Sequence, residues 1–249
     1  MIDPSIRSDL APTGRLRVGI NYGNPVLATR DATSGELGGV AVDLARELGD
    51  RAGLPIALVG YESAGQMVEG LRAGAWDVAF LAVDPARAGE IDFTAPYVEI
   101  EGTYLVPSGA PIREIADVDG DGVRIAVSAN SAYDLFLART LQHAELVRAP
   151  DPNAAFELLV AGKVNVVAGV KQSLLVNAER LPGSRLLDGR FMAIQQALGI
   201  PIGRDAGANY LREFIEDVKA SGLVMRAMER AGVRGVSVAP KAPVRYVQK

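Results

Sequence analysis

The sequence of 249 residues contains no cysteine and a single histidine, His143. Without cysteine the chain has no disulfide, no thiol nucleophile and no thiolate metal site. His143 follows a predicted helix in a polar context, and no G-x-S-x-G nucleophile motif accompanies it, so we interpret it as a surface residue. We therefore expect neither catalytic residues nor a metal site.

Long hydrophobic runs and basic clusters are also missing. No run of about 18 apolar residues occurs, which predicts that nothing in the chain spans a membrane. Lys and Arg total 26 against 30 Asp and Glu, giving a formal net charge of -4, so nucleic acid is not an expected partner. Neither a G-x-x-x-x-G-K loop nor a G-x-G-x-x-G motif follows a predicted strand, so no cofactor is expected.

The first residues, Met1 to Arg15, lack the charged and then apolar layout of a secretory signal. Either a leader has been trimmed or none existed. The sequence itself therefore leaves the compartment open.

Hydrophobic periodicity predicts two successive βαβαβ units. In the first, the strand that begins at Leu16 is followed by a helix with apolar residues four apart, ending near Gly53. The expected strands are 16–20, 56–59, 77–83, 124–128, 145–147 and 164–170, and the expected helices of the second unit are 131–142 and 151–161. Parallel pairing with right-handed crossovers is the expected solution for each unit.

A short internal repeat supports this organisation. Residues 71–79 align with residues 159–167, in both cases as a helix end, a Gly stop and a buried strand. Residues 191–200 are predicted to be a strand, residues 209–220 and 223–231 to be helices, and the tail after Val238 to be loosely attached. Two α/β lobes of this kind place a ligand site at the carboxyl ends of their strands, in the cleft between them.

The segment from Asp77 to Tyr97, DVAFLAVDPARAGEIDFTAPY, resembles the family 3 periplasmic solute-binding proteins of ABC transporters, the polar amino-acid-binding class. In that family a strand leads to Thr-Pro-x-Arg, and five residues later comes an acid-Phe-Ser/Thr-x-Pro-Tyr element. Here Asp84-Pro-Ala-Arg87 and Asp92-Phe-Thr-Ala-Pro-Tyr97 keep the spacing. The likeness extends over roughly residues 16–232.

The resemblance implies a bilobal α/β fold of the periplasmic-binding-protein type II, in which two doubly wound lobes are joined by two crossover strands. Lobe 1 would hold residues 1–98 and 199–249, lobe 2 residues 103–192, and the crossovers residues 99–102 and 193–198. A small molecule would bridge the lobes and favour the closed state, which an ABC permease in the membrane then reads. The resemblance also implies a periplasmic location and a monomer.

Residue roles follow from the same resemblance. Arg87 matches the arginine that takes a ligand carboxylate as a bidentate pair, although it could instead be a surface residue paired with Asp84 or Glu90. Asn130-Ser131-Ala132 matches a segment whose backbone N–H groups bind the same carboxylate, and Ser131 could also be an N-cap. Asn21, Tyr22 and Asn24 fall in a ligand-binding loop of lobe 1, with Tyr22 equally compatible with the core.

Departures from the family pattern bear on the ligand. Ala82 stands where amino-acid binders usually present a hydroxyl, and Gly169 stands where an acid should hold the α-ammonium group. An ammonium group without a counter-ion in a closed cleft would be costly. We therefore predict an organic or keto acid rather than an ordinary α-amino acid, with Arg87 and Lys171 as cationic contacts; alternatively, Asp84 is a displaced ammonium anchor.

Two other functions stay open. Some relatives of the family are dehydratases, and Asp84 with Lys171 is the one titratable pair that we can nominate for such chemistry. The third hypothesis is a sensory or leaderless cytoplasmic binding protein that passes its signal to a partner protein.

Overall fold

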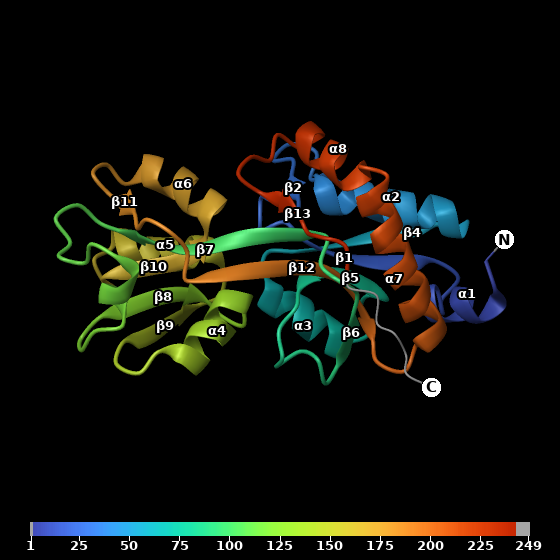
Figure 1. The fold of residues 1–249 in the computed structure, drawn as a ribbon, viewed down its shortest axis with the longest axis horizontal. Coiled ribbons are helices and arrows are strands. Elements are labelled where there is room, and N and C mark those ends of the chain that lie inside the picture. Colours follow the sequence, from blue (N-terminus) through green and yellow to red (C-terminus); the bar gives the residue numbers. More distant parts are fainter. Residues whose placement is uncertain (1, 243–249) are drawn as a thin grey trace.

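The computed structural model describes residues 2–242 and consists of two α/β lobes side by side (Figure 1). A single eleven-stranded sheet runs through both lobes, with the main order β4-β1-β5-β12-β7-β10-β8-β9. The predicted bilobal α/β fold is confirmed. The connection consists of β7 (Val98–Val106) and β12 (Met192–Pro201), two long antiparallel strands that pair with each other over residues 98–102 and 192–196.

Lobe 1 is built around the parallel strands β4, β1 and β5, which β12 extends on its antiparallel side. Its elements are α1 (Pro4–Leu10), β1 (Leu16–Asn21), β2 (Thr29–Arg30), β3 (Leu37–Gly38), α2 (Val40–Ala52), β4 (Ile56–Tyr61), α3 (Ala64–Arg72), β5 (Val78–Ala82), β6 (Ile91–Phe93), α7 (Asp205–Ala220), α8 (Leu223–Arg230) and β13 (Ser237–Val238).

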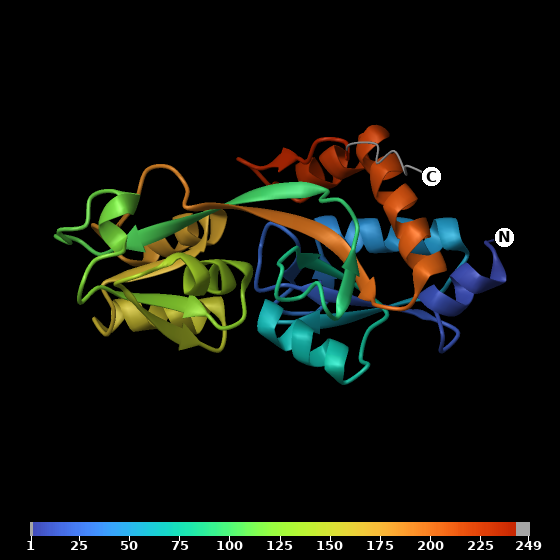
Figure 2. The ribbon, with the colours of Figure 1, turned by 60° about the horizontal axis from the view of Figure 1, so that its bottom comes forward.

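Lobe 2 repeats the arrangement with the parallel strands β10, β8 and β9, and β7 lies antiparallel beside β10. Its elements are a 3-10 helix (Ile115–Val118), β8 (Arg124–Ser128), α4 (Ala132–Thr140), β9 (Glu145–Ala149), α5 (Pro152–Val160), β10 (Val166–Val170), α6 (Lys171–Arg180) and β11 (Arg185–Leu186). Figure 2 shows β7 and β12 passing from one lobe to the other as a continuous pair.

The internal repeat predicted from the sequence has the same backbone role in both lobes. Gly74 ends α3 and Gly162 follows α5, both in the left-handed region at φ 63° and 66°. Three residues later comes a polar side chain, Asp77 in lobe 1 and Asn165 in lobe 2. Asp77 accepts the backbone N–H of Arg17 on β1, and Asn165 accepts the backbone N–H of Arg124 on β8. The repeat therefore fixes the register of each strand that follows it.

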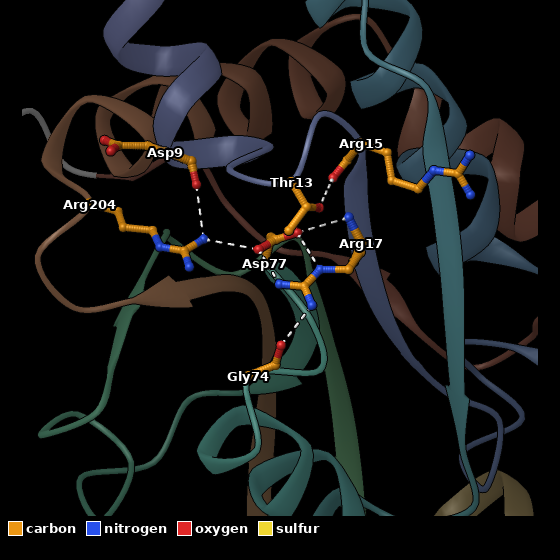
Figure 3. A network of polar contacts seen from close by, with 7 residues as sticks. All are labelled: Asp9, Thr13, Arg15, Arg17, Gly74, Asp77 and Arg204. Carbon is orange, nitrogen blue, oxygen red and sulfur yellow. Dashed lines mark hydrogen bonds and ion pairs between the residues drawn. The ribbon is translucent and has the colours of Figure 1, made fainter.

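Asp77 lies at the end of the lobe 1 sheet away from the other lobe and is fully buried (Figure 3). Arg17 donates to both of its carboxylate oxygens at 2.9 and 2.8 Å, and Arg204 donates to Oδ1 at 3.2 Å. Burial acts to raise the pKa of Asp77, but these hydrogen bonds outweigh it and hold the pKa below its ordinary value. This network ties α7 to the first strand and has a structural role.

One expectation needs correction, and one helix was missed. The tail after Val238 is not loose at its start, because Ala239 is buried and donates its N–H to the carbonyl of Tyr97. Residues 243–249 of that tail lie outside the described residues. The helix α6 was not predicted, because it begins directly after β10 with no capping side chain to mark its start.

Candidate functional site

The lobes meet around an inner cavity of about 50 Å³, lined by residues from both of them. The carboxyl ends of β1, β5, β8 and β10 all face it, as the alternation of strands and helices requires. Its polar lining residues are Asn21, Asn24, Ser63, Ser128, Ser131, Tyr133, Ser173, Asn177 and Gln196. Among residues 2–242, no Asp, Glu, Lys or Arg lines this cavity.

Four helices begin at the wall of the inner cavity. Their first turns contribute Ser63 and Ala64 from α3, Ser131 to Tyr133 from α4, Pro152 from α5, and Val170 and Ser173 from α6. Because the N-terminus of a helix carries partial positive charge and free N–H groups, this arrangement favours an anionic or hydrogen-bond-accepting group.

The α6 N-terminus differs from the other three. Side chains of Ser63, Ser131 and Asp151 cap α3, α4 and α5, each accepting a backbone N–H three residues on. The residue before α6 is Val170, which has no acceptor and makes no capping bond. The first N–H groups of α6 are therefore available to a ligand in the cavity.

Two buried polar atoms at the cavity wall have no partner in the described chain. They are Oε1 of Gln196 and Oγ of Ser128, in residues that are 4% and 1% exposed. A buried polar atom without a hydrogen bond costs about 1–3 kcal/mol. Burial also raises the pKa of the neighbouring Tyr133 to about 12, so its hydroxyl is protonated at neutral pH.

An outer cleft of about 550 Å³ adjoins the inner cavity and shares Gly23, Pro152, Ser173 and Asn177 with it. Tyr22 and Glu62 line this outer cleft from lobe 1. Arg30 donates to the hydroxyl of Tyr22, which in turn donates to Glu62. The outer cleft therefore adjoins the inner cavity on the side of Tyr22.

The sequence-predicted site residues divide into four groups. Asn21, Asn24, Ala82, Ser131 and Ala132 line the inner cavity. Tyr22 lines the outer cleft, while Arg87 and Asn130 line a separate pocket between α3 and α4. Asp84 and Lys171 line none of these three spaces.

Arg87 is 3% exposed and crosses the boundary between the lobes. Its Nη1 donates to the carbonyl of Ala82 at 2.6 Å, and its Nη2 donates to the carbonyl of Asn130 in lobe 2 at 2.7 Å. Burial lowers the pKa of Arg87 to about 10, against the opposing effect of Asp84, so the guanidinium stays charged at neutral pH. Contact between Arg87 and a ligand carboxylate stays a prediction.

Asp84 forms a second link between the lobes. It is 3% exposed, and both of its carboxylate oxygens accept from Arg139 of α4, at 3.1 and 2.9 Å. Its Oδ1 also accepts the N–H of Ala86. We call the Asp84–Arg139 ion pair, together with the Arg87–Asn130 bond, the interlobe latch.

Lys171 extends away from the inner cavity and pairs with Glu101 on β7 at 2.6 Å. Asp84 and Lys171 thus belong to two separate ion pairs, so the structure does not assemble the pair nominated for dehydratase chemistry. Among the described residues, no group of three or more His, Asp or Glu side chains could hold a metal ion.

Gln196, Ser128, Ser173 and Asn177 were not predicted as site residues. Gln196 lies on β12, where the neighbouring Gln195 is exposed, and sequence alternation alone cannot show which of the two faces the cavity. Ser173 and Asn177 lie on the helix that was not predicted.

Comparison with known proteins places this geometry in a family. Residues 16–231 match the family described as bacterial extracellular solute-binding proteins, family 3. A curated relative, the virulence sensor protein BvgS of Bordetella bronchiseptica, is 29% identical over 171 residues, which are 68% of this chain but only 13% of the sensor.

Solved structures agree in fold. A solute receptor for L-cysteine from Neisseria gonorrhoeae has a TM-score of 0.81 and 22% identity, covering 94% of this chain and 99% of the receptor. A substrate-binding protein of an amino acid ABC transporter from Streptococcus pneumoniae, bound to L-arginine, has a TM-score of 0.76 and 19% identity, covering 89% and 96%. Within the described residues, no helix has the length and apolar character needed to cross a membrane. The chain belongs to the bacterial extracellular solute-binding proteins of family 3.

Proposed function

We propose that this protein is the solute-binding component of an ABC uptake system and closes over a small carboxylate-bearing molecule that lacks an α-ammonium group. The observation that carries this proposal is the charge asymmetry of the inner cavity. Four helix N-termini reach its wall, and among residues 2–242 no acidic side chain does.

An ammonium group would be poorly stabilised in this cavity. Gly169, at the position where the resemblance places an acid, lines the wall and offers no charge. The N-terminus of α6 begins two residues after Gly169, and its partial positive charge would repel an ammonium group. Because burying an unpaired charge is costly, the cavity disfavours amino acids.

A carboxylate would be favoured for the opposite reason. The guanidinium of Arg87 contacts the carbonyl of Ala82, and Asp84 nearby pairs with Arg139, which makes a cluster of two cations and one anion. Because Asp84 and Arg139 neutralise each other, the remaining positive charge is that of Arg87, which is 3% exposed and is therefore weakly screened by water. The cluster and the α6 N-terminus together stabilise a negative charge in the cavity.

Transport is proposed from family membership. When a binding protein closes over a solute, the surface that it presents to a membrane permease changes, so the permease can distinguish the closed state from the open one. A periplasmic location and a monomeric state are proposed on the same basis, since the family is described as extracellular.

A sensory role is the second candidate, favoured by the similarity to BvgS, of which the chain matches 13%. In that case closure would be read by another part of a sensor rather than by a permease. The ligand site would be the same in both cases, so a binding assay applies equally to both.

The proposal is tested by a thermal-shift screen of the purified protein against matched monocarboxylates, amino acids and sugars. A ligand at 100 times its Kd adds about 2.7 kcal/mol of stability, which corresponds to an increase in Tm of roughly 5–10 °C for a chain of this size. We expect shifts with carboxylates that have no amine. Shifts confined to amino acids or to sugars would contradict the proposed ligand class.

Replacing Arg87 with Ala should abolish carboxylate binding, because it removes the net positive charge of the cluster and one interlobe bond. Arg72→Ala is the matched control, since Arg72 is 64% exposed and pairs with Glu90 outside the inner cavity. Retained carboxylate affinity in Arg87→Ala would contradict this role.

A further inference from the structure

The amide of Gln196 is one of the two unpartnered polar groups at the cavity wall, and the anion site does not explain it. Its Oε1 is buried without a partner, yet Gln196 belongs to β12, one of the two strands that connect the lobes. The backbone of Gln196 pairs with both Ala82 and Val98, so Gln196 keeps its place relative to the lobe 1 wall of the cavity when lobe 2 moves. Gln196 is therefore a fixed point against which a ligand can be positioned.

The amide of Gln196, in a cavity without an acidic side chain among the described residues, favours a neutral partner. An amide oxygen accepts a hydrogen bond, and the adjoining amide nitrogen donates one, so a hydroxyl group, which can do both, satisfies either end. An ammonium group could also donate to the oxygen, but it would carry a charge into a cavity whose described lining has no acid. A hydroxyl is thus the donor that fits this position.

The volume of the inner cavity limits the size of the ligand portion that is enclosed there, because a longer ligand would extend into the adjoining outer cleft. A water molecule needs roughly 10–15 Å³ of such space, so about 50 Å³ corresponds to three to five waters. Covalently bonded atoms lie closer together than waters, which allows a ligand of roughly four to seven non-hydrogen atoms. Acids of two or three carbons fall in this range.

From these features we propose that the ligand is a short hydroxycarboxylate. Its carboxylate binds at the uncapped N-terminus of α6, and its hydroxyl donates to Oε1 of Gln196. This inference rests on the proposed function, because it concerns the same cavity and the same carboxylate. It adds Gln196 as the residue that determines specificity for the second group of the ligand.

Isothermal titration calorimetry with lactate, propionate, pyruvate and alanine tests the inference. These four acids have the same three-carbon chain and differ only at the carbon next to the carboxylate. Lactate carries a hydroxyl there, pyruvate a carbonyl oxygen and alanine an amine, whereas propionate carries only hydrogen. We expect one enantiomer of lactate to bind at least about tenfold more tightly than the other three, because a site built for a hydroxyl is left with an unpaired polar group by analogues that lack it. Glycolate, acetate and glycine repeat the comparison with one carbon fewer.

Gln196→Leu should remove the preference for lactate over propionate while leaving propionate binding unchanged. The matched control is Gln195→Leu on the same strand, whose side chain is exposed and bonds to Glu99. The leucine variant removes a buried polar atom that has no partner, so its Tm should not fall. If Gln196 had a purely structural role, the Tm would instead fall and the ratio of the lactate and propionate affinities would stay the same.

The outcomes separate the two proposals. Binding of carboxylates without a preference for the hydroxyl, or an unchanged lactate preference in Gln196→Leu, would overturn the role of Gln196 and leave the carboxylate site standing. Binding of alanine as tight as that of lactate would overturn the inference as well. A complete lack of carboxylate binding would overturn the proposed function and this inference with it.

Discussion

The interlobe latch gives the sharpest prediction about how fast a ligand leaves. Asp84 of lobe 1 and Arg139 of lobe 2 pair through two hydrogen bonds only while the lobes are together. Replacing Arg139 with Ala removes the pair from the lobe 2 side. It leaves Asp84 in place with its bond to the N–H of Ala86, so the local turn is kept.

The expected size of the effect follows from the exposure of the two partners. Hydrogen bonds to charged groups contribute about 1.5–3 kcal/mol when buried, whereas exposed ion pairs contribute about 0.2–1 kcal/mol. Asp84 is 3% exposed but Arg139 is 44% exposed, which places this pair between the two cases. We take about 1.4 kcal/mol, which is a tenfold change in the equilibrium between open and closed lobes.

Because a ligand enclosed by both lobes must wait for them to open, the dissociation rate should rise about tenfold in Arg139→Ala. Stopped-flow measurement with the carboxylate identified by the thermal-shift screen gives this rate. Arg124→Ala is the matched control, since Arg124 is 45% exposed and pairs with Glu145 within lobe 2.

The movement itself can be followed with paired spin labels, because the chain has no cysteine of its own. Cysteines introduced at the exposed positions Glu69 on α3 and Ala138 on α4 report the separation of the lobes. Arg139→Ala should increase the fraction of long distances, and the control Arg124→Ala should not. An unchanged dissociation rate together with an unchanged distance distribution would refute the latch.

Three further substitutions probe closure, ligand class and stability. Gly65→Ala places a Cβ 2.8 Å from the carbonyl oxygen of Ala129 in the other lobe, which opposes closure of the lobes. The affinity for the carboxylate ligand should therefore fall about tenfold through overpacking. The Tm of the ligand-free protein, measured in the same samples, should not fall, because alanine favours the helix. Gly169→Asp supplies the missing acid, although its Cβ would lie 3.2 Å from the side chain of Leu174. Calorimetry should show weaker binding of lactate and tighter binding of alanine than in the unchanged protein. An unchanged ratio of the lactate and alanine affinities would contradict our interpretation of Gly169. Asp77→Asn should cost about 2 kcal/mol at pH 7. Since the folded-state pKa of Asp77 is lowered, its contribution is present above the unfolded value of about 3.9 and is lost as pH falls through the folded value, so urea denaturation should show the deficit shrinking below about pH 4. A deficit that is the same at pH 3 and pH 7 would exclude this charge effect.

The parts of the fold that were predicted correctly are those with local signals. The apolar spacing of α2 and the glycine after it predicted both the helix and its end, and Gly53 adopts the left-handed conformation expected of a C-cap. The start of α3 also carries a local signal, since Ser63 accepts the N–H of Gln66 and the side chain of Gln66 accepts the N–H of Glu62. By contrast, α6 has no N-cap side chain, and the sequence around Lys171 gave no sign of its start.

Sequence by itself determined the two-lobed architecture, the family and several lining residues, because hydrophobic periodicity, glycine stops and motif spacing are properties of neighbouring residues. Tertiary structure alone decided which partners the charged side chains find and whether they line the inner cavity. Arg87 and Asp84 were both found from their motif, but their partners Asn130 and Arg139 lie 43 and 55 residues away in the other lobe. Hydrogen bonds and ion pairs act over a few ångströms, so the role of a charged side chain depends on the residues that lie next to it when the lobes are together. Which residues these are is a property of the fold and not of the local sequence.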